Sequence, residues 1–473
     1  MMNRSIKFVG FFVAGACLLL TGCPDKSKPE SSDNTPVINA NQQQAETPVT
    51  VTRVIPEADQ ADVTATFALL EQFKGKYEKN EVGAVVAISL KMSNVLDQAA
   101  QDELFDAINK LIDLEKVTFD GPGVDDDSIV RLTNLKKVKT ALFENASITT
   151  ASLKMMAETM EDLTTLAVNR CMKLDGNSIS AITKGMPKLK NLDLQSTAFK
   201  TFDLRTLPNL TELEQLDLRQ CTELDGNVMK YVAGIPALKV LRLKGKIYRD
   251  SSMENLAGHP TLKALLLQDA DVTNDFLDSV TSIPMLIDLS MFRLLDIDND
   301  GMEKLEGAKL QILFIRENDW IDDEGIAVIK TMPDLRRLTL YELRAVTDEG
   351  LIAAISGKKN LVNLAFYDME GITDKSIEAL RTTTALRNLE LGKTGQTDAT
   401  LKLASLLPRL ETITIGDNSK FTDTGLAFLG ESKSLKTIAI MNITGITAGA
   451  IEEFRVQHPA IEIKFRSTGG QAE

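Results

Sequence analysis

The chain has 473 residues, of which 43% are hydrophobic and 25% charged, which is enough apolar sequence to bury an extended core. Its formal net charge of −14 at pH 7 argues against nucleic acid or an anionic membrane face as a general partner, because both carry negative charge. The four cysteines and two histidines are a small set of ligands for a transition metal.

Residues 1–22 have the pattern of a secretory signal peptide. Two cations, Arg4 and Lys7, precede an apolar run over residues 8–20 that is too short for a membrane-spanning helix. The run ends in LTGC, whose last residue is Cys23, and this motif resembles the lipobox of bacterial lipoproteins. The resemblance implies that Cys23 begins the mature chain and carries acyl chains such as palmitate. These would anchor the protein to a membrane of the bacterial cell envelope, at its periplasmic or extracellular face. The alternative is an ordinary secretory signal with an incidental cysteine.

Two segments precede the main domain. Residues 23–60 are rich in Pro, Ser, Asn, Gln and acidic residues, and such a segment cannot bury enough surface to offset its ordering entropy, so we predict a disordered tether. Residues 61–80 are predicted to form an amphipathic capping helix through Phe67, Leu70 and Phe73. Without a cap, the end of the domain would expose apolar side chains and an unpaired strand edge.

The domain over residues 81–467 repeats the pattern apolar-x-x-apolar-x-apolar, and residues 468–473 after it are predicted to be a loose tail. Leu335/Leu338/Leu340 is one such triplet, and the middle residues of twelve clear triplets lie 24, 25 or 26 positions apart. Alternate apolar residues point to one side of a short strand, so each triplet is predicted to be a strand. Weaker copies lie around Ile88, Val117 and Ala141, and a last strand ends the series at Ile463.

The second half of each repeat is predicted to be a helix that begins at a threonine. Thr347 is placed as an N-cap, with Asp348 and Glu349 in the first turn, where a hydroxyl and anions satisfy free N–H groups and the helix dipole. The pairs Thr373-Asp374 and Thr422-Asp423 repeat this order. We therefore interpret the recurring TD as a helix start and not as a catalytic acid pair.

This alternation of strand and helix resembles the leucine-rich repeat. The resemblance implies an α/β solenoid with a curved, parallel inner sheet of about sixteen strands and short outer helices. The phrase I-T-D-x-x-I/L, with an asparagine or cysteine five residues past some strand centres, resembles the ribonuclease-inhibitor-like, cysteine-containing subclass found in F-box proteins and in bacterial lipoproteins. The F-box motif is not found in this sequence, so ubiquitin-ligase function does not carry over.

The sequence offers little for chemistry. Cys171 and Cys221 occupy the same place in repeats separated by one other repeat, about 10 Å apart, which is too far for a disulfide, so they are predicted to be buried thiols. His259 and His458 lie in different repeats, and no nucleophile–base arrangement is indicated. The segments DIDNDG (296–301) and GVDDDS (123–128) superficially resemble calcium loops but are interpreted as turns before helices. No catalytic residue, metal site or cofactor is predicted.

Some strand positions that face the concave side hold unusual side chains. The residue after the last apolar position of each strand, and the residue between its two inner apolar positions, should lie on that side. In five strands these positions gather an aromatic patch, defined as Phe292, Phe314, Arg316, Tyr341 and Tyr367. Three carboxylates flank it, namely Glu317, Glu342 and Asp368.

Aromatic residues and arginine are enriched at binding hot spots, so the patch is a candidate ligand site. The alternative is a set of cross-strand aromatic pairs that only stabilises the sheet. Trp320, in the turn before a helix, is interpreted as a packing residue.

Taken together, the sequence predicts a non-enzymatic, membrane-anchored binding scaffold whose partner is an unknown protein. Solenoids of this family mostly bind proteins through their concave face, and fold alone does not determine the ligand. Two alternatives stay open: a structural component of the cell envelope, and a carbohydrate-binding module that uses Tyr341 and Tyr367. The membrane is expected as a partner only through the lipid anchor, and nucleic acid is not expected.

Overall fold

The computed structural model describes residues 57–93 and 97–465. The predicted signal peptide, Cys23, most of the predicted tether and the predicted tail therefore lie outside the described residues. The described residues belong to one structural unit. Within the described ranges, none of the helices combines the length and the apolar character needed to cross a membrane.

The unit is built on one sheet of seventeen strands. Strands β2 to β17 are parallel and follow chain order, while β1 is antiparallel to β2. The strands are β1 (Lys76–Lys79), β2 (Val85–Lys91), β3 (Lys116–Asp120), β4 (Thr140–Glu144), β5 (Thr165–Asn169), β6 (Asn191–Asp193), β7 (Gln215–Asp217), β8 (Val240–Lys244), β9 (Ala264–Gln268), β10 (Asp288–Phe292), β11 (Ile312–Arg316), β12 (Arg337–Tyr341), β13 (Asn363–Met369), β14 (Asn388–Thr394), β15 (Thr412–Gly416), β16 (Thr437–Met441) and β17 (Glu462–Phe465).

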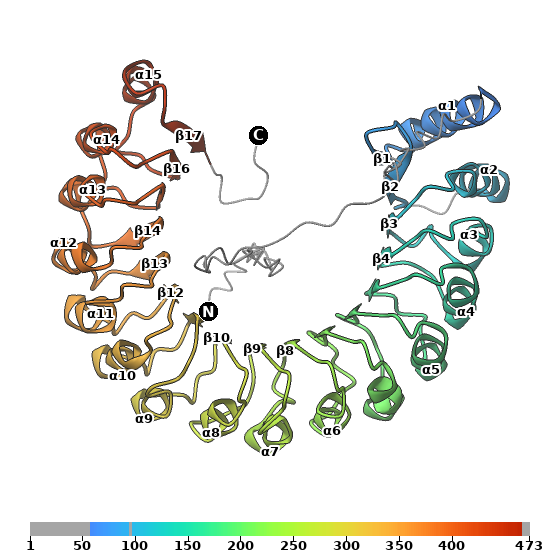
Figure 1. Ribbon diagram of the computed structural model, residues 1–473, viewed down its shortest axis with the longest axis horizontal. Coiled ribbons are helices and arrows are strands. Elements are labelled where there is room, and N and C mark those ends of the chain that lie inside the picture. Colours follow the sequence, from blue (N-terminus) through green and yellow to red (C-terminus); the bar gives the residue numbers. More distant parts are fainter. Residues whose placement is uncertain (1–56, 94–96, 466–473) are drawn as a thin grey trace, which may run out of the picture. The chain divides into compact units, whose positions relative to one another are not determined.

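A helical segment connects each pair of successive parallel strands, and the helices lie on the outer side of the arc of strands (Figure 1). The α-helices are α1 (Glu57–Gln72), α2 (Gln98–Asn109), α3 (Asp126–Val130), α4 (Thr150–Thr159), α5 (Gly176–Gly185), α6 (Val228–Val232), α7 (Asp250–Met253), α8 (Phe276–Thr281), α9 (Asn299–Glu303), α10 (Asp323–Ala327), α11 (Asp348–Ile355), α12 (Asp374–Ile377), α13 (Asp398–Ser405), α14 (Asp423–Gly430) and α15 (Ala448–Gln457). The 3₁₀ segments are η1 (Thr201–Asn209), η2 (Glu254–Leu256), η3 (Val328–Thr331) and η4 (Glu378–Thr382).

The parallel strands pair without any shift in register. Leu289 pairs with Leu313, and Leu313 pairs with Leu338, so the leucines of successive repeats form columns. Most strands alternate half-buried and buried residues. The buried leucines face the helices and form one continuous core, where each contributes roughly 1.5–3 kcal/mol by leaving water. This arrangement confirms the predicted α/β solenoid with its parallel inner sheet.

The N-terminal end differs from the helix predicted over residues 61–80. Helix α1 ends at Gln72, and β1 follows and pairs with β2. The helix ends there because Lys74 takes a left-handed conformation, with φ of 54°, and the N–H of Gly75 donates to the carbonyl of Leu70 at 2.6 Å, as at many helix C-termini. Leu70 is fully buried, and β1 covers the edge that β2 would otherwise expose.

The TD pairs do begin helices, and they also join neighbouring repeats. Thr373 caps α12 by accepting a hydrogen bond from the N–H of Lys375. Its own N–H and hydroxyl donate to Asp348 of the preceding repeat. We call this series the threonine–aspartate ladder. Its pairs are Asp126/Thr149, Asp250/Thr273, Asp323/Thr347, Asp348/Thr373, Asp374/Thr397, Asp398/Thr422 and Asp423/Thr447.

The asparagine and cysteine that follow the strands make a second set of contacts between repeats. Asn318 is fully buried, and its amide donates to the carbonyl of Leu294 at 2.5 Å. Cys221 stands at the same position of an earlier repeat, and its thiol donates to the carbonyl of Leu194 at 3.1 Å. Cys171 and Cys221 are buried and unpaired, as predicted, and burial raises the pKa of the Cys171 thiol to about 12.

The two calcium-like segments are helix starts, as interpreted from the sequence. Asp125 caps α3 and Asp298 caps α9, each with its side chain accepting hydrogen bonds from backbone N–H groups of the first turn. Over residues 57–93 and 97–465, no group of three or more histidine, cysteine and acidic side chains has the arrangement to hold a metal ion.

Candidate binding surface on the concave face

The structure brings the five residues of the aromatic patch together. Phe292 lies on β10, Phe314 and Arg316 on β11, Tyr341 on β12 and Tyr367 on β13, all on the half-buried side of their strands. The register aligns Phe292, Arg316, Tyr341 and Tyr367 in one row across four adjacent strands. Phe314 lies in the neighbouring row.

The rings of the patch contact one another at angles. The ring centroids of Phe314 and Tyr341 are 5.8 Å apart with an interplanar angle of 69°, and those of Tyr341 and Tyr367 are 5.9 Å apart at 59°. The guanidinium of Arg316 lies 4.7 Å from the centroid of the Phe292 ring. Edge contacts and cation–π contacts of this kind add about 0.5–1.5 kcal/mol each to the burial of the rings.

Both tyrosine hydroxyls donate to a carboxylate that lies two strands farther along the sheet. Tyr341 donates to Glu390 on β14 at 2.7 Å, and Tyr367 donates to Asp417, just after β15, at 2.7 Å. Burial, followed by the nearby carboxylate, raises the pKa of both phenols, so they stay protonated donors. Glu390 and Asp417 were not predicted from the sequence, although both lie on the same face in the repeat pattern.

A left-handed residue follows most strands and sets the position of the charged side chains. Arg293, Glu317 and Glu342 have φ values of 54°, 53° and 59°. The N–H of each donates to a strand carbonyl of the next repeat, Arg293 to Arg316 at 2.8 Å for example. A left-handed conformation costs about 1 kcal/mol or more in a residue with a side chain. The added inter-repeat hydrogen bond offsets that cost and aligns these side chains along the edge of the patch.

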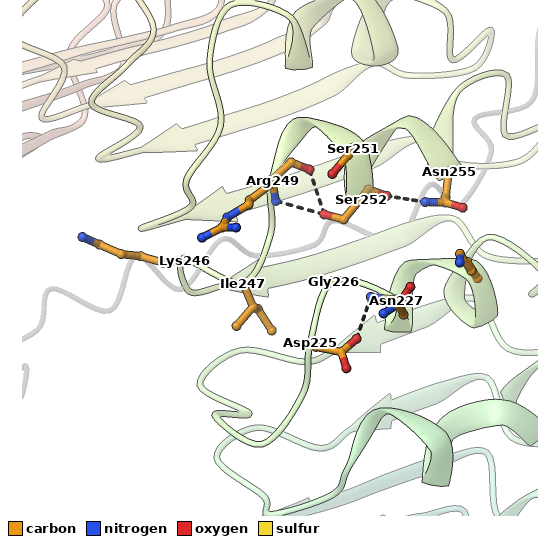
Figure 2. A pocket seen from close by; sticks show the side chains of 10 residues that line it. Asp225, Gly226, Asn227, Lys246, Ile247, Arg249, Ser251, Ser252 and Asn255 are labelled. Atoms are coloured by element: carbon orange, nitrogen blue, oxygen red, sulfur yellow. Dashed lines mark hydrogen bonds between the residues drawn. The ribbon is translucent and has the colours of Figure 1, made fainter.

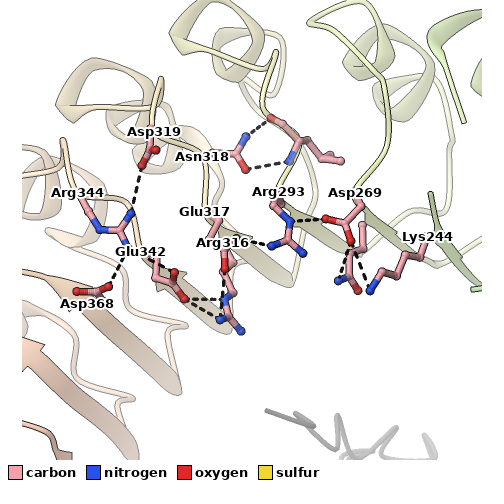
Figure 3. A network of polar contacts seen from close by, with 12 residues as sticks. Lys244, Asp269, Arg293, Arg316, Glu317, Asn318, Asp319, Glu342, Arg344 and Asp368 are labelled. Atoms are coloured by element: carbon pink, nitrogen blue, oxygen red, sulfur yellow. Dashed lines mark hydrogen bonds and ion pairs between the residues drawn. The ribbon is translucent and has the colours of Figure 1, made fainter. Parts of the chain in front are cut away.

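Together with other charged residues at the ends of the strands, these side chains form a continuous series of ion pairs, which we call the charge ladder (Figure 3). Arg293 pairs with Asp269 and, at 3.0 Å, with Glu317. Arg316 pairs with Glu342 at 2.7 Å. The remaining pairs are Lys244–Asp269 at 3.4 Å, Arg316–Glu317 at 3.4 Å, Arg344–Glu342 at 3.5 Å, Arg344–Asp319 at 3.7 Å, Arg344–Asp368 at 2.9 Å and Lys393–Asp368 at 2.7 Å.

The carboxylates that flank the patch are therefore engaged. The side chains of Glu317 and Glu342 are each 16% exposed and that of Asp368 is 11% exposed. Burial, with repulsion from Glu342, raises the pKa of Glu317. Burial also opposes ionisation of Asp368, but hydrogen bonds from Lys393 and Arg344 lower its pKa overall. The flank is thus a set of internally paired charges rather than a free acidic surface.

Trp320 does not pack as interpreted from the sequence. It is 71% exposed, in the loop between β11 and α10. The buried positions of that loop are taken by Asn318 and Ile321, which leaves the indole outside. Leu295, in the preceding loop, is 52% exposed, so two apolar side chains project from the loops that follow the strands of the patch.

Gly392 leaves the space that the ring of Tyr367 occupies. The two residues pair across β13 and β14, and a Cβ atom at position 392 would overlap the Tyr367 ring. We expect Gly392→Ala to lower the free energy of unfolding by about 1–3 kcal/mol, as overpacking does. The measurement is urea unfolding in a double-mutant cycle. In a Tyr367→Ala background the same change should cost almost nothing, and an equal cost in both backgrounds would contradict this role.

Comparisons with known proteins bear on the fold and little on the function. No family model matches the chain. Among solved structures, the chain is similar to the yeast Rad7–Elc1 complex, with a TM-score of 0.53, 18% identity and coverage of 86% of this chain and 92% of that chain. It is less similar to the TLR13–ssRNA13 complex (TM-score 0.49, 16% identity, 76% and 51% covered) and to an internalin of Listeria monocytogenes (0.36, 17%, 83% and 98%).

One curated protein also matches, a putative RNA-binding protein of Caenorhabditis elegans named EEED8.10. It is 25% identical over 193 residues, which are 39% of this chain and 23% of that protein. The chain therefore spans less than a quarter of that relative. With the repeat pattern and the single sheet, the structural likeness identifies the fold as a leucine-rich-repeat solenoid. The charge argument against nucleic acid stays a prediction, and the similarity to a putative RNA-binding protein does not support it.

Proposed function

We propose that the protein is a non-enzymatic binding scaffold that recognises a protein partner through the aromatic patch. The observation that carries the proposal is the joining of Phe292, Phe314, Arg316, Tyr341 and Tyr367 into one half-exposed surface. Aromatic residues and arginine dominate the energetics of protein interfaces. A chain that is only 5% aromatic concentrates four rings here, on positions that the repeat does not need for its core.

Preorganisation supports the same proposal. The charge ladder and the tyrosine–carboxylate bonds hold the patch in one arrangement before a ligand arrives, so less side-chain entropy is lost on binding. Because the flanking charges already neutralise one another, apolar contact should supply most of the affinity. Binding is therefore expected to weaken only slightly between 50 and about 300 mM salt.

The proposed setting is the bacterial cell envelope. The cationic start, the apolar run and the LTGC motif support a lipoprotein that is anchored through Cys23 at the periplasmic or extracellular face. Cys171 and Cys221, at equivalent buried positions, support the cysteine-containing subclass of the repeat. Mass spectrometry of the purified chain, showing an acylated N-terminal peptide that begins at Cys23, would test the anchor directly.

The function is tested by paired affinity capture from detergent extracts of native membranes. The baits are the full chain, a Phe292→Ala/Phe314→Ala variant and a Phe202→Ala control. The side chains of Phe292 and Phe314 make no hydrogen bond, so the variant removes ring area and the ring contacts of Phe292 with Arg293 and Arg316, while every ion-pairing group stays in place. Phe202 is 64% exposed on η1, away from the sheet. We expect the double variant to lose the partner by at least about tenfold, as hot-spot truncations do, and the control to retain it.

The other outcomes distinguish the alternative functions that the sequence leaves open. Equal capture by all three baits would remove the patch from the proposal. Absence of a specific partner for the unmodified chain would favour a structural component of the envelope. Retention of a polysaccharide that the double variant loses would favour the carbohydrate-binding module.

A further inference from the structure

A cationic cavity lies on the strand-to-helix side of the solenoid, distinct from the concave patch. Beside the cavity, one of the hydrogen bonds that join the helix starts of neighbouring repeats is missing. In most repeats the first residue after the N-cap carries an Asp, Asn or Thr side chain that accepts the N-cap N–H of the next repeat, as Asp250 does for Thr273. Gly226 occupies this position before Arg249, so that acceptor is missing.

A second break, two repeats earlier, has a different neighbour. Gly176 precedes Lys200, and there the carboxylate of Asp203 fills the space beside the glycine and accepts the N–H of Lys200 at 2.8 Å. Ser252 stands at the matching place after Arg249 and accepts its N–H at 2.9 Å. Beside Arg249, the neutral hydroxyl of Ser252 thus stands where Lys200 has the carboxylate of Asp203, while the N-cap residue is a cation in both repeats.

This break opens into a cavity of about 720 Å³ between the loops that precede α6 and α7 (Figure 2). That volume lies within the range of small-molecule sites. Three cations line it, namely Lys230, Lys246 and Arg249. Three cations around one cavity are notable in a chain with a net charge of −14.

The cations of the cavity are available to a ligand. Across the part of the chain that the structure describes, neither Lys230 nor Lys246 makes an ion pair. Arg249 uses its Nε for Asp271 at 3.0 Å, which leaves both terminal nitrogens of the guanidinium. One lining carboxylate opposes them, that of Asp225, which accepts the N–H of Asn227 at 2.8 Å.

From this arrangement we infer a binding site for a small molecule that carries a phosphate or sulfate group. Ammonium and guanidinium groups that line one cavity with hydroxyl and amide donors are the kinds of group that recognise such oxyanions. Ser251 and Asn227 supply those neutral donors, and Ile247 offers an apolar contact for a carbon skeleton. Ser252 fills the place beside Gly226, and the ligand anion lies against the cationic side chains that line the cavity.

Isothermal titration of the full chain in detergent tests the inference, with inorganic phosphate and glucose 6-phosphate as probes at constant ionic strength. The test variant is Lys230→Gln/Lys246→Gln. The control is Lys154→Gln/Lys173→Gln, which removes one exposed helix lysine and one exposed loop lysine elsewhere. We expect saturable binding by the unmodified chain and the control, and at least about tenfold weaker binding by the test variant.

A second variant does not depend on lysine. Ser252→Asp reproduces the arrangement of Asp203 beside Lys200, so it should keep the fold and abolish binding. The inference is overturned if the unmodified chain binds neither probe, or if both double variants bind equally. It is also overturned if single-stranded RNA alone binds through Lys230 and Lys246, because the site would then serve a polymer backbone.

Discussion

Replacing Asp374 with alanine is expected to destabilise the repeats around it by about 2–4 kcal/mol. Its carboxylate accepts four hydrogen bonds from the next repeat: from the N–H and hydroxyl of Thr397 at 2.9 and 2.7 Å, and from those of Thr400 at 3.1 and 2.5 Å. Hydrogen bonds to a charged group contribute about 1.5–3 kcal/mol each when partly buried, and the donors regain some of this from water.

The effect should depend on pH in a defined direction. Burial opposes ionisation of Asp374, but the hydrogen bonds from Thr397 and Thr400 lower its pKa overall. A carboxyl with a lowered folded-state pKa stabilises the fold above its unfolded pKa of about 3.9, and this contribution is lost as pH falls through the folded value. The difference between the unmodified chain and Asp374→Ala should therefore be full at pH 7 and shrink below about pH 4.

Urea unfolding by circular dichroism measures the change, and amide hydrogen exchange over residues 374–400 locates it, because a long array of repeats can unfold in parts. Asp334→Ala is the matched control, since Asp334 is exposed and its replacement should change stability by less than about 0.5 kcal/mol. Equal effects of the two substitutions would show that the threonine–aspartate ladder does not stabilise the stack.

Replacing Asn318 with leucine is expected to cost about 2–4 kcal/mol, although it adds apolar surface. The buried amide bonds both backbone groups of Leu294, donating to its carbonyl at 2.5 Å and accepting from its N–H at 3.4 Å. Leucine has a similar volume but leaves these groups without that partner, and an unsatisfied buried group costs about 1–3 kcal/mol. Thermal and urea unfolding measure the loss.

Cysteine provides the matched substitution at the same position. Cys221 occupies it in an earlier repeat and bonds the carbonyl of Leu194, so Asn318→Cys keeps one contact and should lose roughly half as much as Asn318→Leu. If leucine were as stable as asparagine, packing alone would determine this position. The recurrence of asparagine and cysteine at this position would then have no energetic basis here.

The repeat made much of the fold predictable. A period of 24 to 26 residues places strands β3 to β17, and alternation within a strand assigns each residue to the core or to the concave side. The positions of Phe292, Tyr341 and Tyr367 followed from that alternation without any tertiary information. The end of α1 could not be predicted in this way, because Lys74 takes a left-handed conformation, which is uncommon for a lysine.

Contacts that span more than one repeat could not be predicted from the sequence. The bond from Tyr341 to Glu390 joins residues 49 positions apart, and it depends on how far a phenol reaches across two strands of a curved sheet. The exposure of Trp320 depends on which loop residues occupy the two buried positions. The cationic cavity shows no motif, since it arises from the absence of a side chain at Gly226 beside a cation at Arg249.

The unshifted register of the sheet has a consequence for how this surface can vary. Any concave residue is located by two integers, the repeat to which it belongs and its place in the strand. A substitution at such a position changes one side chain of the concave face and leaves the leucine columns unchanged. Recognition and folding are thereby separated in the sequence itself. The protein can acquire a new ligand by exchanging concave side chains that do not pack on one another, because the leucine core stays the same.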